Sequence, residues 1–162
     1  MISFGYRLTD PATLQGWEHG HDVGTAAKSE LWWSGFPGDV SISVGADEIS
    51  TRFGWVPLLH FAASIVGITE ELSPPGSSAV YSFTEADEQL RFDRGRELIQ
   101  ISASFTPEVV STSLPDLSLA ARGFAARLVD ELSVRYPRLS QNPAITDLLE
   151  RSAGEGVSGQ EG

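Results

Sequence analysis

Cysteine is absent from the sequence and lysine is almost absent, which excludes several kinds of site and partner. Without cysteine, the 162-residue chain can form neither disulfides nor thiolate metal sites. Lys28 is the only lysine, and 22 carboxylates against 11 basic residues give a net charge of −11. Nucleic-acid binding needs a basic surface for contacts to phosphate. We therefore predict that no nucleic acid is a partner.

Long apolar runs are also missing. No stretch approaches the roughly 18 apolar residues of a membrane span. Residues 1–4 begin the chain without the basic segment and apolar run of a signal peptide. These two absences predict a cytoplasmic protein with no membrane partner. The length and the 41% of apolar residues suit one globular domain with its own core.

The negative charge is concentrated in the first part of the chain. Residues 8–90 contain twelve carboxylates but only two basic residues, whereas residues 91–162 contain ten carboxylates and eight arginines. Such a charge can simply keep a protein soluble, or it can attract a basic partner. The sequence leaves both interpretations open.

Alternating apolar and polar residues predict an antiparallel sheet. Side chains two residues apart share one face of a strand, and this pattern predicts hairpins over 40–53 and 90–105 and a strand over 79–84. Residues 2–8 alternate in the same way and predict an opening strand. We place the turn of the second hairpin at Asp93-Arg94-Gly95, with the positive φ at Gly95.

Two longer segments have the pattern of helices. Residues 55–67 are apolar almost all round, which is typical of a buried helix. Apolar residues at three- and four-residue steps predict an amphipathic helix over 116–136, with Asp116 as its N-cap. A short helix follows from Pro143. Residues 152–162 are rich in Gly, Ser and Glu and predict a disordered tail.

Strands and helices come in blocks, and this order favours the α+β class. We expect one antiparallel sheet of about five to six strands, built on hairpins 40–53 and 90–105. The helix near 55–67 and the helix near 116–136 pack on this sheet. The prediction is a single α+β domain over 1–151, followed by the tail.

Histidines are the main candidate metal-binding or catalytic groups. His19 and His21 point the same way in an extended segment and can hold a metal if His60 or a carboxylate joins them. A polar loop is the alternative. Ser64 lies one helical turn from His60, but no nucleophile elbow, P-loop or dinucleotide motif occurs. We predict no metal, no cofactor and no enzymatic activity.

The adjacent Trp32 and Trp33 are the strongest candidate contact residues. Neighbouring side chains in a strand face opposite ways, so both are buried only if the segment lies between two layers. The alternative is that at least one is exposed, and tryptophan is enriched at interaction hot spots. Acidic residues around an aromatic anchor suit a basic protein partner. The predicted contact surface comprises Trp32, Trp33, Glu30, Asp39, Asp47 and Glu48.

Three segments carry a resemblance to known proteins: GDVSISVGADEIS, WVPLLHFAASI and YSFTEADEQLRFDRGRELIQIS. Together they resemble a group of small uncharacterised proteins of high-GC bacteria, some of which are similar to immunity proteins of polymorphic toxin systems. The resemblance covers about residues 38–135 and rests on apolar pattern and turn spacing. It implies a small cytoplasmic binding protein that neutralises a toxin domain, and it assigns no functional residue.

The leading hypothesis is therefore a non-enzymatic protein-binding protein, in particular an immunity protein that neutralises a basic toxin domain. The alternative is a small-molecule binding or sensing domain, with a pocket between the sheet and the helix at 55–67. A metal-dependent hydrolase that uses His19, His21 and His60 is the third hypothesis.

Overall fold

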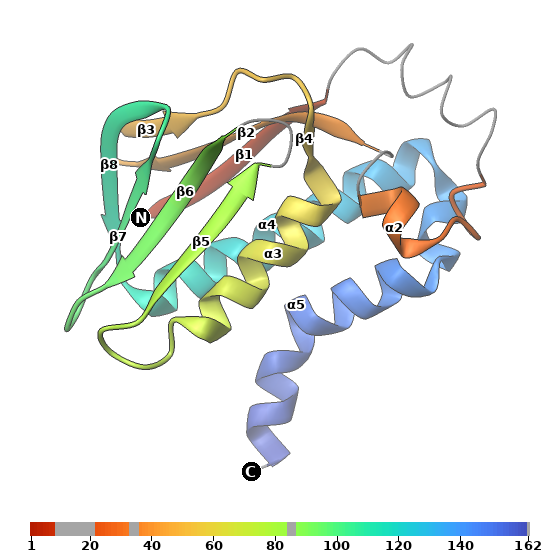
Figure 1. Cartoon of the computed structure of the whole chain (residues 1–162). Helices are drawn as coiled ribbons and strands as arrows, with labels where there is room; N and C mark the ends of the chain where they lie inside the picture. Colours follow the sequence, from red (N-terminus) through yellow and green to blue (C-terminus); the bar gives the residue numbers. More distant parts are fainter. Residues whose placement is uncertain (9–21, 33–35, 84–86, 162) are drawn as a thin grey trace.

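The computed structural model describes residues 1–8, 22–32, 36–83 and 87–161, with only the backbone described from residue 154 onward (Figure 1). It confirms the α+β class. Antiparallel strands form two sheets of four strands each, and helices pack on them.

The first sheet has the strand order β1-β2-β3, with β4 paired to β2 beyond the end of β3. Its strands are β1 (Ile2–Leu8), β2 (Pro37–Val44), β3 (Asp47–Ser50) and β4 (Val56–Pro57). A two-residue connection that begins with Gly45 at φ 60° joins β2 to β3. Glycine takes this position in type II′ hairpins because it adopts a positive φ without strain.

The second sheet has the order β5-β6-β7-β8. Its strands are β5 (Ser78–Phe83), β6 (Glu88–Arg94), β7 (Ile99–Ala103) and β8 (Thr106–Thr112). The predicted strands are confirmed, but the single sheet of five to six strands is wrong. β3 lies against β8 without a hydrogen-bonded ladder between them, so the strands divide into two sheets.

The turn between β6 and β7 differs from the prediction. Asp93 and Arg94 still belong to β6, where they pair with β7, and Gly95 does not have a positive φ. Instead, the Gly95 amide donates to the carbonyl of Leu98 at 2.8 Å and closes a longer connection. The polar residues that suggested a turn are therefore side chains on a strand that is exposed on one face.

Two helices, α3 (Leu58–Glu71) and α4 (Leu114–Arg135), lie side by side across the sheets (Figure 1). α3 contacts β5 and β2, and α4 contacts β1, so the pair of helices covers both sheets. Both predicted helices are confirmed, but the N-cap of α4 is Ser113. The Ser113 hydroxyl oxygen accepts a hydrogen bond from the Asp116 amide at 3.2 Å, and Pro115 fits the first turn.

Further helices complete the chain. α2 (Lys28–Glu30) precedes the first sheet's second strand, and the 3₁₀ helix η2 (Pro137–Gln141) follows α4. α5 spans Pro143–Glu161 and therefore includes most of residues 152–162, for which the sequence predicts a disordered tail. The division into one domain and a tail stays a prediction.

Four aromatic rings at the centre of the molecule join both sheets to α3 and α4. We call Phe4, Phe61, Tyr81 and Phe124 the core aromatic cluster. Phe61 lies 5.1 Å from Tyr81 and 6.0 Å from Phe124, and Phe124 lies 5.7 Å from Phe4, between ring centroids. None of the four is more than 4% exposed. The two sheets consequently share one hydrophobic core.

A buried asparagine fixes the segment before α2. The Asn142 side-chain amide donates to the carbonyls of Val23 and Ala26, both at 2.9 Å, and its oxygen accepts from the Ala144 amide at 2.9 Å. Asn142 is 1% exposed. Its side chain thus supplies the partners that buried carbonyls require, and it holds together segments that are far apart in sequence.

Candidate functional site

Trp32, the predicted aromatic anchor, lies in the hydrophobic core. Its side chain is 7% exposed, and the Lys28 ammonium lies 5.8 Å from the centroid of its ring. Glu30 is exposed, and its carboxylate accepts a hydrogen bond from the Ala27 amide at 3.0 Å. Trp33 lies outside the described residues. The sequence left a core role for Trp32 open, and its burial supports that role over an exposed contact.

Asp39 organises the turn that precedes β4. Its carboxylate oxygen accepts hydrogen bonds from the Thr51 hydroxyl at 2.7 Å, the Phe53 amide at 2.8 Å and the Gly54 amide at 3.0 Å. Gly54 has a φ of 78°, which glycine adopts without strain. The predicted contact residue Asp39 therefore has a positioning role, because its carboxylate fixes the backbone that carries Phe53.

A second group of rings gathers where the two sheets meet. The junction aromatic cluster comprises Phe53, Trp55, Phe83 and Phe105. Phe53 stacks on Trp55 at 5.0 Å between centroids and makes edge contacts with Phe105 at 5.2 Å and Phe83 at 5.3 Å. Phe83 is buried, whereas Phe53, Trp55 and Phe105 are only half-buried. Aromatic area on three side chains therefore stays accessible to a partner.

Two adjoining hollows border this cluster. One, of about 640 Å³, is lined by Phe53 and Phe105 together with Glu48, Arg52 and Glu108. The other, of about 540 Å³, shares Glu48 and Arg52 and extends towards β1. We call the region formed by Asp47, Glu48, Arg52, Phe53, Trp55, Phe105 and Glu108 the junction surface.

Acidic side chains predominate on the junction surface. Asp47, Glu48 and Glu108 are exposed, and Arg52 is the basic residue among its members. Glu48 accepts hydrogen bonds from the hydroxyls of Ser50 and Ser43, the latter at 3.4 Å. These contacts hold its carboxylate on the exposed face of β3. Glu48, one of the predicted contact residues, thus adjoins an accessible aromatic group, although not the predicted one, and Asp47 precedes it in β3.

His60 lies on α3 beside the core aromatic cluster. Its Nδ1 is 3.1 Å from the hydroxyl oxygen of Tyr81, within hydrogen-bond distance. Burial lowers the pKa of the His60 imidazole and raises the pKa of the Tyr81 phenol, so both groups are neutral at pH 7. His19 and His21 lie outside the described residues. Within the ranges that the structure describes, no three His, Asp or Glu side chains cluster closely enough to hold a metal ion.

The sequence contained only a weak sign of the junction aromatic cluster. Phe53 and Trp55 flank Gly54, and Phe105 follows the alternation of β7. Each ring taken alone resembles an ordinary strand-end residue. Only the contact between β3 and β8, which are far apart in sequence, brings the rings together.

Comparisons with protein-family models, with curated proteins and with solved structures found no match. Within the part of the chain that the structure describes, no helix has the length and apolarity needed to cross a membrane.

Proposed function

We propose that this chain is a non-enzymatic protein-binding protein and that its contact surface is the junction surface. The observation that carries the proposal is the half-buried stack of Phe53 and Trp55, with Phe105 against it, beside a hollow rimmed by Glu48 and Glu108. Aromatic side chains are enriched at the centres of protein interfaces, and charged residues form their rims. Asp39 contributes indirectly, because it fixes the turn that carries Phe53.

The partner that we propose is basic. The net charge of −11 creates a negative potential that accelerates encounter with a positively charged protein. The exposed carboxylates of Asp47, Glu48 and Glu108 extend this potential to the junction surface itself. With the resemblance to immunity proteins, this charge favours a basic toxin domain whose site the chain blocks by steric and electrostatic occlusion.

The test is affinity capture from the source cell's lysate, at low and high salt, with three baits. The baits are the wild-type chain, the double variant Phe53→Ser/Trp55→Ser, and the control Leu119→Ser/Val134→Ser, which changes two exposed apolar residues of α4. We expect the wild-type and control baits to retain one basic protein that high salt releases. Equal capture by the Phe53→Ser/Trp55→Ser bait would show that binding does not use the junction surface.

Growth measurements test the immunity function separately. Expression of the captured protein alone should arrest growth, and co-expression of the wild-type chain should restore it. The Phe53→Ser/Trp55→Ser variant should fail to restore growth while it remains folded by circular dichroism. A captured protein that leaves growth unchanged would contradict the immunity function but not the protein-binding proposal.

The small-molecule alternative has less support. A pocket between the sheet and residues 55–67 would need space where α3 faces the sheet. Phe61 and Ile65 of α3 are fully buried there, and Phe61 packs on Tyr81 of β5. An open groove of about 600 Å³ lies instead beside α3 and the edge of β5. A thermal shift with a metabolite, abolished by His60→Gln, would favour this alternative.

A further inference from the structure

β5 forms one end of the second sheet and pairs only with β6 among the strands that the structure describes. The Arg94 amide donates to the carbonyl of Ser77 at 2.9 Å, so Ser77 and Arg94 stand at the position of a hydrogen-bonded pair, although the Ser77 amide donates to the carbonyl of Pro74. In an antiparallel ladder such pairs alternate along the strands. The backbone N–H and C=O groups of Ser78, Val80 and Ser82 therefore point away from β6, towards the free edge.

Space for another strand exists along this edge. The groove of about 600 Å³ is lined by Val80 and Ser82 of β5 and by α3 residues that include Ala63, Ser64 and Gly67, and its far side is formed by Lys28, Trp32 and Arg151. Ala63, Ser64 and Gly67 have small side chains, and because the Arg151 guanidinium lies against Gly67, the room for a backbone to approach is beside Ala63 and Ser64. An extended segment in the groove can thus reach the outward groups of β5.

The sequence of β5 lacks the features that protect edge strands. Native edge strands are commonly blunted by charged residues, proline or bulges. β5 reads SAVYSF and contains none of these residues, whereas β8 at the other end of the sheet contains Pro107 and Glu108 and an irregular register opposite β7. Within the described residues, β5 is therefore the less protected edge of this sheet.

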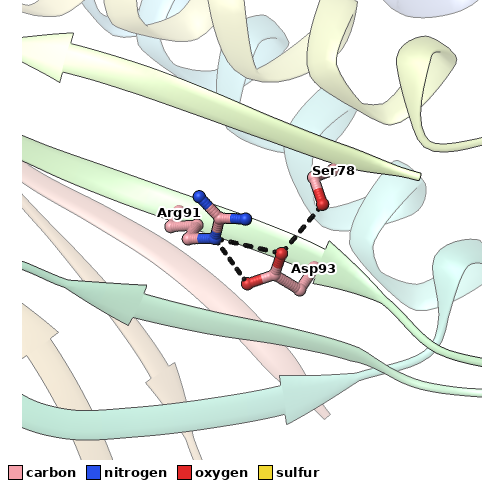
Figure 2. Close-up of polar contacts among 3 residues, drawn as sticks. All are labelled: Ser78, Arg91 and Asp93. Atoms are coloured by element: carbon pink, nitrogen blue, oxygen red, sulfur yellow. Dashed lines mark hydrogen bonds and ion pairs between the residues drawn. The ribbon is translucent and has the colours of Figure 1, made fainter. Parts of the chain in front are cut away.

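The exposed face next to β5 is electrically balanced. Ser78 lies opposite Asp93 of β6, and Val80 lies opposite Arg91. The Arg91 guanidinium donates to both carboxylate oxygens of Asp93, at 3.1 and 2.9 Å, and the Ser78 hydroxyl donates to the same carboxylate at 2.9 Å (Figure 2). The two charges cancel locally, so this part of an otherwise acidic molecule does not repel a second copy of itself.

We propose that β5 pairs with β5 of a second copy and forms a homodimer. The strands run antiparallel about a two-fold axis, with Val80 opposite Val80 of the second copy and Ser78 opposite its Ser82. Ser78, Val80 and Ser82 have outward-pointing backbone groups, and each of these pairs exchanges two hydrogen bonds. Val80, which is 42% exposed in one copy, becomes covered by its equivalent. The second sheets of the two copies join into one continuous sheet.

The dimer has a dependence on salt opposite to that of binding to a basic partner. Each copy carries a net charge of −11, so two copies repel each other at long range. Salt screens this repulsion, because the Debye length falls to about 10 Å at 0.1 M ionic strength. Dimerisation should strengthen with salt, whereas capture of a basic protein should weaken. The dimer does not rest on the proposed function, and each can fail alone.

Analytical ultracentrifugation over a range of protein concentration and salt tests the proposal with Val80→Lys. We expect the wild-type chain to dimerise reversibly, and Val80→Lys to weaken dimerisation by at least about tenfold, because it places like charges at the two-fold axis. Val109→Lys is the control, since Val109 is an exposed valine of β8 in the same sheet, at 38% exposed. A wild-type chain that stays monomeric would overturn the proposal, as would equal dimerisation of Val80→Lys.

An introduced cysteine tests the register. The chain has no cysteine, so Val80→Cys supplies its only thiol. Hydrogen-bonded antiparallel pairs have Cα atoms about 5.5 Å apart, which is within the range of disulfides. We expect Val80→Cys to form covalent dimers under mild oxidation and Val109→Cys to remain largely monomeric. Equal cross-linking of both variants, or dimers of Val80→Cys that do not cross-link, would overturn this register.

Discussion

The core aromatic cluster and the junction aromatic cluster have similar ring spacing but different surroundings. Ring centroids lie 5.1–6.4 Å apart in the first and 5.0–5.8 Å apart in the second. The core rings are at most 4% exposed, whereas three of the junction rings are half-buried. Contact geometry alone therefore does not separate rings that stabilise the fold from rings that can bind. The exposed fraction of the rings does separate them. We therefore expect substitutions in the core aromatic cluster to reduce stability more than substitutions in the junction aromatic cluster.

Loss of a core ring should have the largest effect on stability. Phe124 of α4 is 0% exposed and contacts Phe4 and Phe61. Phe124→Ala should lower the free energy of unfolding by about 3–5 kcal/mol, because it removes buried apolar area and leaves a cavity. Urea denaturation followed by tryptophan fluorescence measures this loss.

The milder Phe124→Leu allows the measurement if Phe124→Ala does not fold. Leucine refills most of the space, so its loss should be smaller, about 1–2 kcal/mol. A loss below 1 kcal/mol in Phe124→Ala would show that the core aromatic cluster is not the centre of stability.

Loss of a junction ring should cost less stability. Phe105 contacts Phe53 and Phe83 but is half-buried, so Phe105→Ala should lower the free energy of unfolding by about 1–2 kcal/mol. The same urea titration gives this value. If Phe105→Ala proves as damaging as Phe124→Ala, the junction rings are part of the core and the distinction between the two clusters fails.

Titration of His60, at the margin of the core aromatic cluster, should make a small contribution to the pH dependence of the free energy of unfolding. Burial lowers its pKa in the folded state, so the unfolded chain takes up the proton first as the pH falls. The free energy of unfolding should therefore be highest above about pH 6.5, the ordinary pKa of histidine, and should fall as the pH drops towards the lower pKa of the folded state.

His60→Gln removes this titration but can keep a hydrogen bond to Tyr81. Melting temperatures of both proteins between about pH 5 and pH 8 measure the difference, because this interval contains the histidine titration. The wild-type melting temperature should decline more steeply than that of His60→Gln below pH 6.5. Parallel curves of melting temperature against pH would show that the pKa of His60 does not differ between the folded and the unfolded state.

Local patterns predicted the elements of the fold well but not how the elements assemble. Alternation depends on side chains two residues apart, so it identified β5, β6 and β7, whereas an all-round apolar segment identified α3 and apolar residues at three- and four-residue steps identified α4. It carries no information on which strands become neighbours, and so it did not predict that β3 lies against β8 without pairing. The cap of α4 was missed for a local reason, because Ser113 and Asp116 are both good capping residues.

The candidate site shows the same limit. Sequence reasoning predicted that Asp47 and Glu48 share a contact surface with Trp32, because the sequence does not show what packs over a tryptophan. Trp32 is covered in the core, while Phe53, less conspicuous in the sequence, is left half-exposed by a turn that Asp39 holds. The acidic character of the junction surface could be predicted from composition. Its aromatic centre could not, because it forms only through packing between segments that are far apart in sequence.

The buried amide of Asn142 also bears on how the chain folds during synthesis. A ribosome makes about 5–20 residues per second, and domains tend to fold as units as they emerge. The carbonyls of Val23 and Ala26 find their partner only when Asn142 has left the ribosome, more than a hundred residues later. The segment before α2 therefore forms its native hydrogen bonds only at the end of synthesis or after it. A nascent chain arrested before Asn142 should leave this segment open to proteases that no longer cut it in the finished protein.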